Sequence, residues 1–107
     1  MAVVILPGAA DDLLELQDYM LAQWDQKLWL KAEDEIFDKL EKADQGLLKG
    51  MPIRELVQLG ITDYKKIITS HHSIVLRRID DDTYVYLVAG QKQDFKSLLF
   101  RRLMNSV

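Results

Sequence analysis

The sequence predicts an α+β domain in which two amphipathic helices precede a three-stranded antiparallel meander and a C-terminal helix. Three observations support this class. Apolar residues recur at intervals of three and four in the first half of the chain, β-branched residues concentrate in three runs of the second half, and short polar connections separate those runs. With 107 residues, 49% of them apolar, the chain is long enough for one core, so residues 1–107 are expected to form a single domain.

The first half begins with a short apolar strand, residues 3–6, which Pro7 ends and which we expect to be buried on both faces. The helix that follows carries one apolar stripe, formed by Leu13, Leu16, Met20 and Trp24. A second helix begins near Lys27 and ends at Gly46, and its stripe contains Trp29, Ala32, Ile36, Leu40 and Ala43. Because few residues separate the two helices, they are predicted to form an antiparallel hairpin.

In the second half, residues 47–62 have no consistent periodicity, and the segment 54–57 suits either a short strand or an irregular connection. The three β-rich runs are residues 64–69, 73–79 and 83–89. Their short connections predict hairpins, which complete a curved sheet with the first strand. We expect the helical hairpin to cover one face of this sheet. A last helix is predicted over residues 94–104, with Phe95, Leu98, Leu99 and Leu103 on one side.

Composition and motifs argue against several function classes. The chain has no cysteine, no signal-peptide pattern and no apolar run of the roughly 20 residues that cross a bilayer, so we expect a cytoplasmic protein with no membrane partner. His71 and His72 are neighbours in an extended segment and are interpreted as turn residues, because their rings point to opposite sides and cannot share a metal ion. Residues 80–82 are three aspartates without the spacing of a calcium loop. No catalytic or nucleotide-binding motif occurs, so we predict no catalytic residue, no metal, no cofactor and no stable small-molecule ligand.

The charge distribution is uneven along the chain. Residues 1–50 hold five Lys or Arg and eleven Asp or Glu, whereas residues 51–107 hold nine and six, within a formal net charge of −3. The basic residues of the second half are natural contacts for an acidic partner or for phosphate groups, although charges that merely solvate two surfaces would give the same pattern. Trp24 and Trp29 flank the corner between the helices, where we expect at least one ring to close the core and any exposed ring to anchor a partner.

Several motifs together resemble the ParE/RelE superfamily of bacterial toxins, and the ParE branch in particular. They are the strand 84–89 followed by a basic corner and the helical segment 94–103, together with Arg54-Glu55-Leu56, the run 60–67 and Tyr19 in the first helix. The resemblance extends over nearly the whole chain, and the order of the motifs is more specific than any one of them. It implies the toxin of a type II toxin–antitoxin pair.

ParE-like toxins poison DNA gyrase by binding, and a cognate antitoxin neutralises them. The resemblance therefore implies gyrase and an antitoxin, the product of an adjacent gene, as partners, and it allows a toxin dimer within the antitoxin complex. We expect the target-binding residues to be Lys92, Lys96, Arg101 and Arg102. We expect the antitoxin-binding residues to be Trp24, Trp29, Lys65 and Arg77. One departure is that Lys92-Gln93-Asp94 stands where many relatives have Arg-Arg-Asp, with Gly90 displaced by one position.

Two alternatives remain open. The first is a RelE-like ribonuclease that cuts mRNA on the ribosome, for which Lys65 and Lys92 occupy suitable positions. The strand position of a needed RelE arginine falls on Ser73 or Ile74, however, and the position of the RelE tyrosine falls on Leu98, which cannot transfer a proton. The second alternative is a relative that binds an antitoxin and has lost its toxicity.

Overall fold

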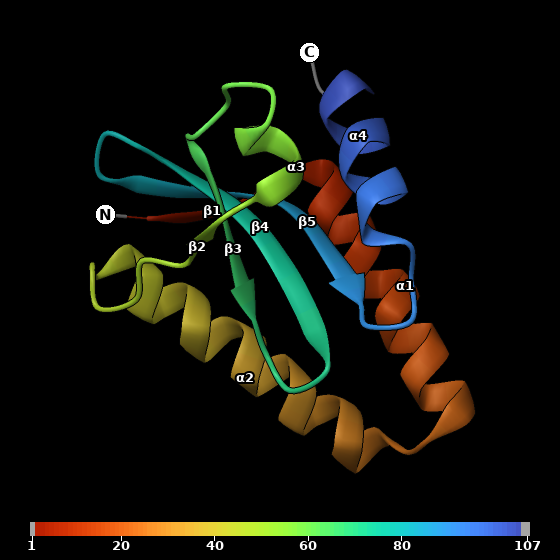
Figure 1. The fold of residues 1–107 in the computed structure, drawn as a ribbon. Coiled ribbons are helices and arrows are strands. Elements are labelled where there is room, and N and C mark those ends of the chain that lie inside the picture. Colours follow the sequence, from red (N-terminus) through yellow and green to blue (C-terminus); the bar gives the residue numbers. More distant parts are fainter. Residues whose placement is uncertain (1, 106–107) are drawn as a thin grey trace.

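The structure, a computed structural model, describes residues 2–105 (Figure 1). Its elements in chain order are β1 (Val3–Ile5), α1 (Pro7–Gln23), α2 (Gln26–Asp44), β2 (Met51–Pro52), α3 (Arg54–Val57), β3 (Tyr64–Ile68), β4 (His72–Ile79), β5 (Asp82–Gly90) and α4 (Phe95–Asn105). This succession confirms the predicted α+β class.

The described strands form one sheet in the order β1-β5-β4-β3-β2. The strands β3, β4 and β5 are antiparallel neighbours, which confirms the meander. At one edge β1 pairs in parallel with β5, from Val3 opposite Thr83 to Ile5 opposite Val85. As an edge strand, β1 is half-buried rather than buried on both faces as expected, because a single strand neighbours it.

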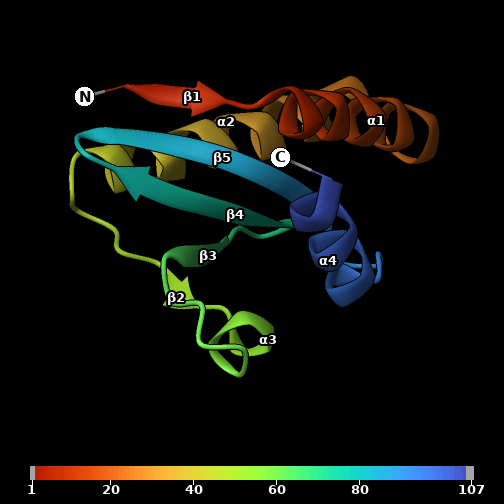
Figure 2. The same ribbon diagram turned by 90° about the horizontal axis from the view of Figure 1, so that it is seen from above.

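The hairpin of α1 and α2 covers one face of the sheet, as Figure 2 shows. Asp25 caps α2 by accepting a hydrogen bond from the backbone N–H of Leu28 at 2.7 Å, which satisfies one of the free donors of the first turn. Gly46, with φ +80°, follows the C-terminal end of α2 in the left-handed conformation that glycine tolerates best. The stripe predicted for α2 is fully buried against Ile67, Ile74, Leu76, Val85 and Val88 of the sheet.

The opposite face of the sheet is also covered, which the sequence prediction did not include. There α3 and α4 lie over β3, β4 and β5 (Figure 2). The segment 54–57, left open between a strand and an irregular connection, is the short helix α3, and Leu56 is buried in this second core. Leu99 of α4 is fully buried, and it packs with Ile53, Leu56, Val75, Leu87 and Ala89.

A β-bulge in β5 explains how this strand contributes to both cores. Val75 pairs with Leu87, whereas the next residue of β4, Leu76, pairs with Val85, so Tyr86 is the extra residue. Side chains of a regular strand alternate between the two faces of the sheet, and the extra residue shifts this alternation by one position. Val85 and Val88, three positions apart, therefore both lie in the core between the sheet and the hairpin of α1 and α2. The bulge at Tyr86 follows Val85, the residue opposite which β1 ends.

Candidate functional site: a groove along α1

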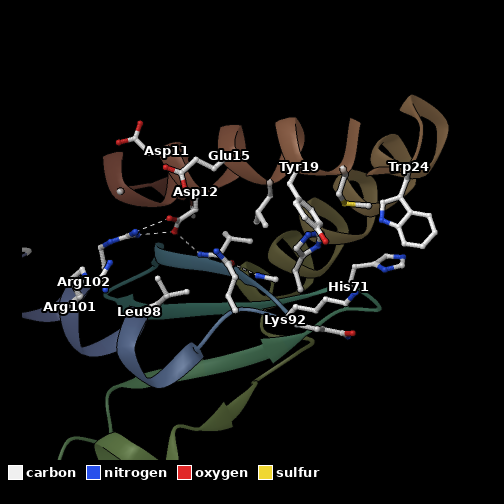
Figure 3. A pocket seen from close by; sticks show the side chains of 18 residues that line it. Asp11, Asp12, Glu15, Tyr19, Trp24, His71, Lys92, Leu98, Arg101 and Arg102 are labelled. Carbon is white, nitrogen blue, oxygen red and sulfur yellow. Dashed lines mark hydrogen bonds and ion pairs between the residues drawn. The ribbon is translucent and has the colours of Figure 1, made fainter. Parts of the chain in front are cut away.

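A groove with a volume of about 1010 Å³ separates α1 from the corner between β5 and α4 (Figure 3). Its α1 wall is formed by residues at helical spacing, namely Gly8, Asp11, Asp12, Glu15, Leu16, Tyr19, Met20 and Trp24. The opposite wall and the floor are formed by His71, His72, Val88, Gly90, Gln91, Lys92, Gln93, Leu98, Arg101 and Arg102. The groove therefore follows almost the whole length of one helix.

The α1 wall changes character along its length. Asp11 and Glu15 are exposed near its beginning, and Tyr19 and Trp24 are exposed near its end, with 50% and 64% of their surfaces accessible. Trp24 is the C-cap residue of α1, so the turn into α2 holds its ring outside the helical stripe. A carboxylate segment thus gives way to an aromatic segment, as Figure 3 shows.

The opposite wall is ordered by short-range hydrogen bonds. The backbone N–H of Gly90 donates to Oε1 of Gln93 at 2.7 Å, and the side-chain amide of Gln91 donates to the carbonyl of Ser70 at 2.8 Å. Asp94 accepts hydrogen bonds from the hydroxyl and the backbone N–H of Ser97, which lower the pKa of its carboxyl group and begin α4. These contacts hold Lys92 and Arg101 at the rim, both exposed.

At one end of the groove, Asp12 and Arg102 form a bidentate ion pair. The two N–O distances are 2.8 and 2.7 Å. Arg102 also donates to the carbonyl of Tyr86 at 2.7 Å, and Asp12 accepts from the backbone N–H of Val88 at 3.0 Å. Because the pairing of β1 ends opposite Val85, these side chains satisfy the backbone groups of β5 just beyond the end of β1.

This ion pair joins α1, β5 and α4, and it changes the interpretation of Arg102. The expected target-binding residue is partly buried and is held by two acceptor groups, and the hydrogen bonds that it donates to Asp12 raise its pKa. Gly8 leaves room for it, since a Cβ atom built at this position would lie 2.9 Å from Nη1 of Arg102. The guanidinium of Arg102 therefore has an internal structural role.

At the other end of the groove, His72 is a buried residue of β4 with 2% of its surface accessible, which corrects its assignment to a turn. Burial lowers the pKa of its imidazole, chiefly by desolvation. Among the described residues, Nδ1 of His72 is the buried side-chain polar atom that has no hydrogen-bond partner. Trp29 packs edge-on against it with ring centroids 6.4 Å apart, and it is buried. Trp29 thus closes the core, as expected of at least one tryptophan, and offers no surface to a partner.

The remaining expected contact residues lie away from the groove. Lys96 is exposed on α4 but does not line it. Lys65 lines a separate cavity of about 300 Å³ near the end of α2 and donates to the carbonyl of Thr62 at 3.2 Å. Arg77 lies over the ring of Tyr64 and forms a 3.7 Å ion pair with Asp63. The structure therefore brings together Trp24, Lys92 and Arg101, and separates them from Lys65 and Arg77.

Sequence reasoning missed the role of α1 as a groove wall. Asp11, Glu15 and Tyr19 recur every four residues beside the apolar stripe, which could have indicated a second functional face of the helix. The ion pair of Asp12 and Arg102 gave no such signal, because 90 residues separate its members. Within the described residues no cluster of His, Cys, Asp or Glu could hold a metal ion. None of the described helices combines the length and apolar character needed to cross a membrane.

The fold and the groove describe a small α+β domain whose surface presents aromatic, acidic and basic side chains around one long depression. The family model for the ParE toxin of the type II toxin–antitoxin system parDE matches residues 3–95. The chain therefore belongs to the ParE toxin family. This match ends at the first residue of α4.

A solved structure described as the chromosomal ParDE toxin–antitoxin system from P. aeruginosa is similar to this chain, with a TM-score of 0.68. The alignment covers 84% of this chain and 95% of that chain at 16% sequence identity, so the likeness shows a shared fold. A comparison with curated proteins found no match.

Proposed function

We propose that this protein is a toxin that inhibits DNA gyrase by binding to it and that a cognate antitoxin neutralises it. The membership in the ParE toxin family carries this proposal. The contact surface for gyrase is the basic corner and the outer side of α4, where Lys92, Lys96 and Arg101 are exposed. Arg102 is omitted from this surface because its guanidinium is bound to Asp12 and to the backbone of β5.

The arrangement of the basic residues favours binding over ribonuclease chemistry. Lys65 and Lys92, the two cations that would suit a RelE-like site, line different cavities. Leu98 packs against the core beneath α4, and Ile74 is fully buried, so neither position supplies an acid or a cation. A ribonuclease would need its proton-transfer groups gathered at one place, and these four positions do not provide them.

The antitoxin is expected to bury at least about 1,000 Å² in total, the lower bound for a specific interface. Trp24 is an exposed aromatic anchor available to it, and Lys65 and Arg77 are further contacts on the sheet if the antitoxin wraps around the molecule. The proposal also includes a second toxin copy within this complex. It further includes a cytoplasmic location, which the lack of cysteine favours. Co-expression with the adjacent gene product should relieve growth arrest and yield a complex; the absence of both results would contradict this part.

The target is tested with purified gyrase, by measuring supercoiling and the accumulation of cleaved DNA. The wild-type protein should inhibit supercoiling, and the double variant Lys96→Glu/Arg101→Glu should inhibit roughly tenfold less, because it reverses two charges of the contact surface. The matched control is Lys27→Glu/Lys31→Glu, which reverses two exposed charges on α2. Equal inhibition by both folded variants would remove this surface from the proposal.

Two further outcomes separate the alternatives. If the wild-type protein has no effect on gyrase but cleaves message in a ribosome-dependent assay, the ribonuclease replaces the gyrase inhibitor. If it has neither activity and still binds the antitoxin, the protein is a non-toxic relative.

A further inference from the structure

We propose that the small cavity at the C-terminal end of α2 is a binding site for a phosphate monoester that carries one small apolar group, such as an aryl phosphate. The cavity has a volume of about 300 Å³, and among the described residues it shares no lining residue with the groove along α1. This site is independent of the proposed function. The sequence alone predicted no small-molecule ligand, because the segments that form the cavity lie far apart in the chain.

Two glycines bring the segment after α2 close to the sheet. Gly46, with φ +80°, follows the end of α2, and Gly50, with φ +75°, lies against β3. A Cβ atom built on Gly50 would lie 3.1 Å from Cβ of Lys65 and 3.1 Å from the carbonyl oxygen of Lys66, which is closer than ordinary contact. Residues 46–50, which run from α2 towards β2 in Figure 1, can therefore form one wall of the cavity.

The floor of the cavity is apolar. Ala43 and Leu76 are buried members of the core between the sheet and the helical hairpin, and Leu48 packs against that core. Lys65 of β3 pairs with Leu76 of β4, so the two side chains stand on the same face of the sheet. The floor thus offers a surface for an apolar group next to a cation.

The cations around the cavity are available to a ligand. Lys49, Lys65 and Arg78 line it, and among the described residues none of them forms an ion pair with a carboxylate. Lys65 donates to the carbonyl of Thr62 at 3.2 Å, and Arg78 reaches the carbonyl of Asp81 at 3.5 Å, which is long for a hydrogen bond. An ammonium group has three donors and a guanidinium group has five, so both side chains retain N–H groups for an anion.

Negative groups near the cavity are largely compensated within the protein. Asp63 lines the cavity and forms a 3.7 Å ion pair with Arg77, which does not line it. Asp44, at the end of α2, is buried and hydrogen-bonded elsewhere. The carbonyls of residues 41–43 accept hydrogen bonds from the backbone N–H groups of residues 45–47, which weakens the negative potential at this helix end.

The charge and the size of the cavity define the ligand class. Three cations and one carboxylate line it, which leaves a formal charge of +2. A phosphate monoester carries about −1.5 to −2 charges at pH 7 and has three acceptor oxygens, so it matches both the charge and the number of cations. Ligand sites span roughly 300–1,000 Å³, and this cavity lies at the lower end, so the apolar part of the ligand is no larger than about one ring.

Nucleic acid is the other phosphate-bearing candidate, and the geometry favours it less. A nucleic-acid backbone presents a row of phosphates, and its affinity comes from cations that neutralise several of them. Here the three cations surround one apolar floor, which the backbone of a nucleic acid has no group to fill. The cavity is therefore assigned to a small phosphate ester.

Calorimetric titration with phenyl phosphate measures the binding. The wild-type protein should bind it in a saturable manner, and Lys49→Glu/Arg78→Glu, which reverses two exposed charges of the cavity, should bind it roughly tenfold or more weakly. The matched control is Lys27→Glu/Lys31→Glu, which makes the same change in net charge on exposed residues of α2 outside the cavity and should bind as the wild type does. Absence of saturable binding at millimolar phenyl phosphate, or equal affinities of the two folded variants, would overturn the proposal.

Amide chemical shifts of isotope-labelled protein locate the ligand. Addition of phenyl phosphate should shift the signals of Leu48 and Lys65 and leave those of Tyr19 and Gly90, which line the groove, unchanged. Shifts confined to the neighbourhood of Lys92 would instead show that the anion binds at the basic corner, and this result would also overturn the proposal.

Two further probes test the apolar part of the site and the nucleic-acid alternative. Inorganic phosphate should bind several-fold more weakly than phenyl phosphate, because it has no group to cover Leu48 and Leu76. Equal affinities would contradict the apolar part. A short DNA duplex that binds more tightly than phenyl phosphate and loses this affinity in Lys49→Glu/Arg78→Glu would replace the small ester by nucleic acid. None of these measurements uses gyrase or antitoxin, so their outcome is separate from that of the proposed function.

Discussion

The two ends of the groove differ in whether their side chains find partners within the protein. At one end, Asp12 and Arg102 are bound to each other and to the backbone of β5. At the other end, Trp24 is exposed and Nδ1 of His72 has no partner among the described residues. Both features of the second end are unfavourable for the isolated protein. We interpret the first end as the part that fixes the fold and the second as the part that awaits a partner.

Among variants of residues that line the groove, the largest expected effect follows from removing Arg102. Arg102→Ala should lower the free energy of unfolding by about 2–4 kcal/mol, because it leaves the partly buried carboxylate of Asp12 and the carbonyl of Tyr86 without their donor. Urea denaturation measures this change. Arg101→Ala is the control, and as an exposed substitution it should change stability by no more than about 0.5 kcal/mol. Similar stabilities of the two variants would contradict the structural role of Arg102.

The end of the groove that contains His72 is tested by the pH dependence of protein stability. Burial lowers the pKa of His72 below its usual value of 6.5, so on acidification the unfolded chain binds a proton before the folded protein does. Stability should therefore fall as the pH drops below 6.5, by up to about 1.4 kcal/mol for each pH unit until the pKa of the folded state is reached. The nearby charges of Glu35 and His71 act on this pKa in opposite directions, and both are weaker than the burial.

The measurement compares wild-type protein and His72→Leu by urea denaturation between pH 5 and pH 7. Both proteins share every other ionisable group, His71 included, so the difference between the two slopes belongs to His72. Parallel slopes would show that His72 does not carry the pH dependence, whereas a flatter slope for the variant agrees with a neutral buried imidazole.

The smallest expected effect concerns the exposed anchor. Trp24→Ala should change the free energy of unfolding by no more than about 0.5 kcal/mol, because most of the side chain already contacts solvent. Trp29→Ala, five positions away, is the contrast, and it should cost about 3–5 kcal/mol because it removes a buried ring. Thermal unfolding of both variants measures the difference. Comparable losses would show that Trp24 belongs to the core and is not a free anchor.

Local pattern in the sequence was sufficient for most of the element order. The stripe of α2 from Trp29 to Ala43 was predicted residue by residue, since the burial of one helical face repeats with the helical period. The meander was predicted because connections of three residues leave adjacent strands no other simple arrangement. The family resemblance added the toxin class, which the match over residues 3–95 confirms.

The candidate site was predicted only in parts. Lys92, Arg101 and Trp24 were identified as contact residues from charge, aromatic character and resemblance, but nothing in the sequence indicated that they surround one groove. Arg102 was included because it is basic, and Trp29 because it lies near the corner. Each side chain is committed elsewhere by contacts to residues distant in sequence, with Asp12 in one case and His72 in the other.

The sequence by itself determined the helices, the strands and the apolar stripes, because these depend on side chains a few positions apart. The tertiary structure decided which face of the sheet α4 covers, how the bulge at Tyr86 shares β5 between two cores, and which charged residues are neutralised inside the protein. The physical reason is that pairing across the sheet and between α1 and α4 depends on the directions in which whole elements approach each other. The same alternation of apolar and charged residues is compatible with several such approaches, and packing selects one of them.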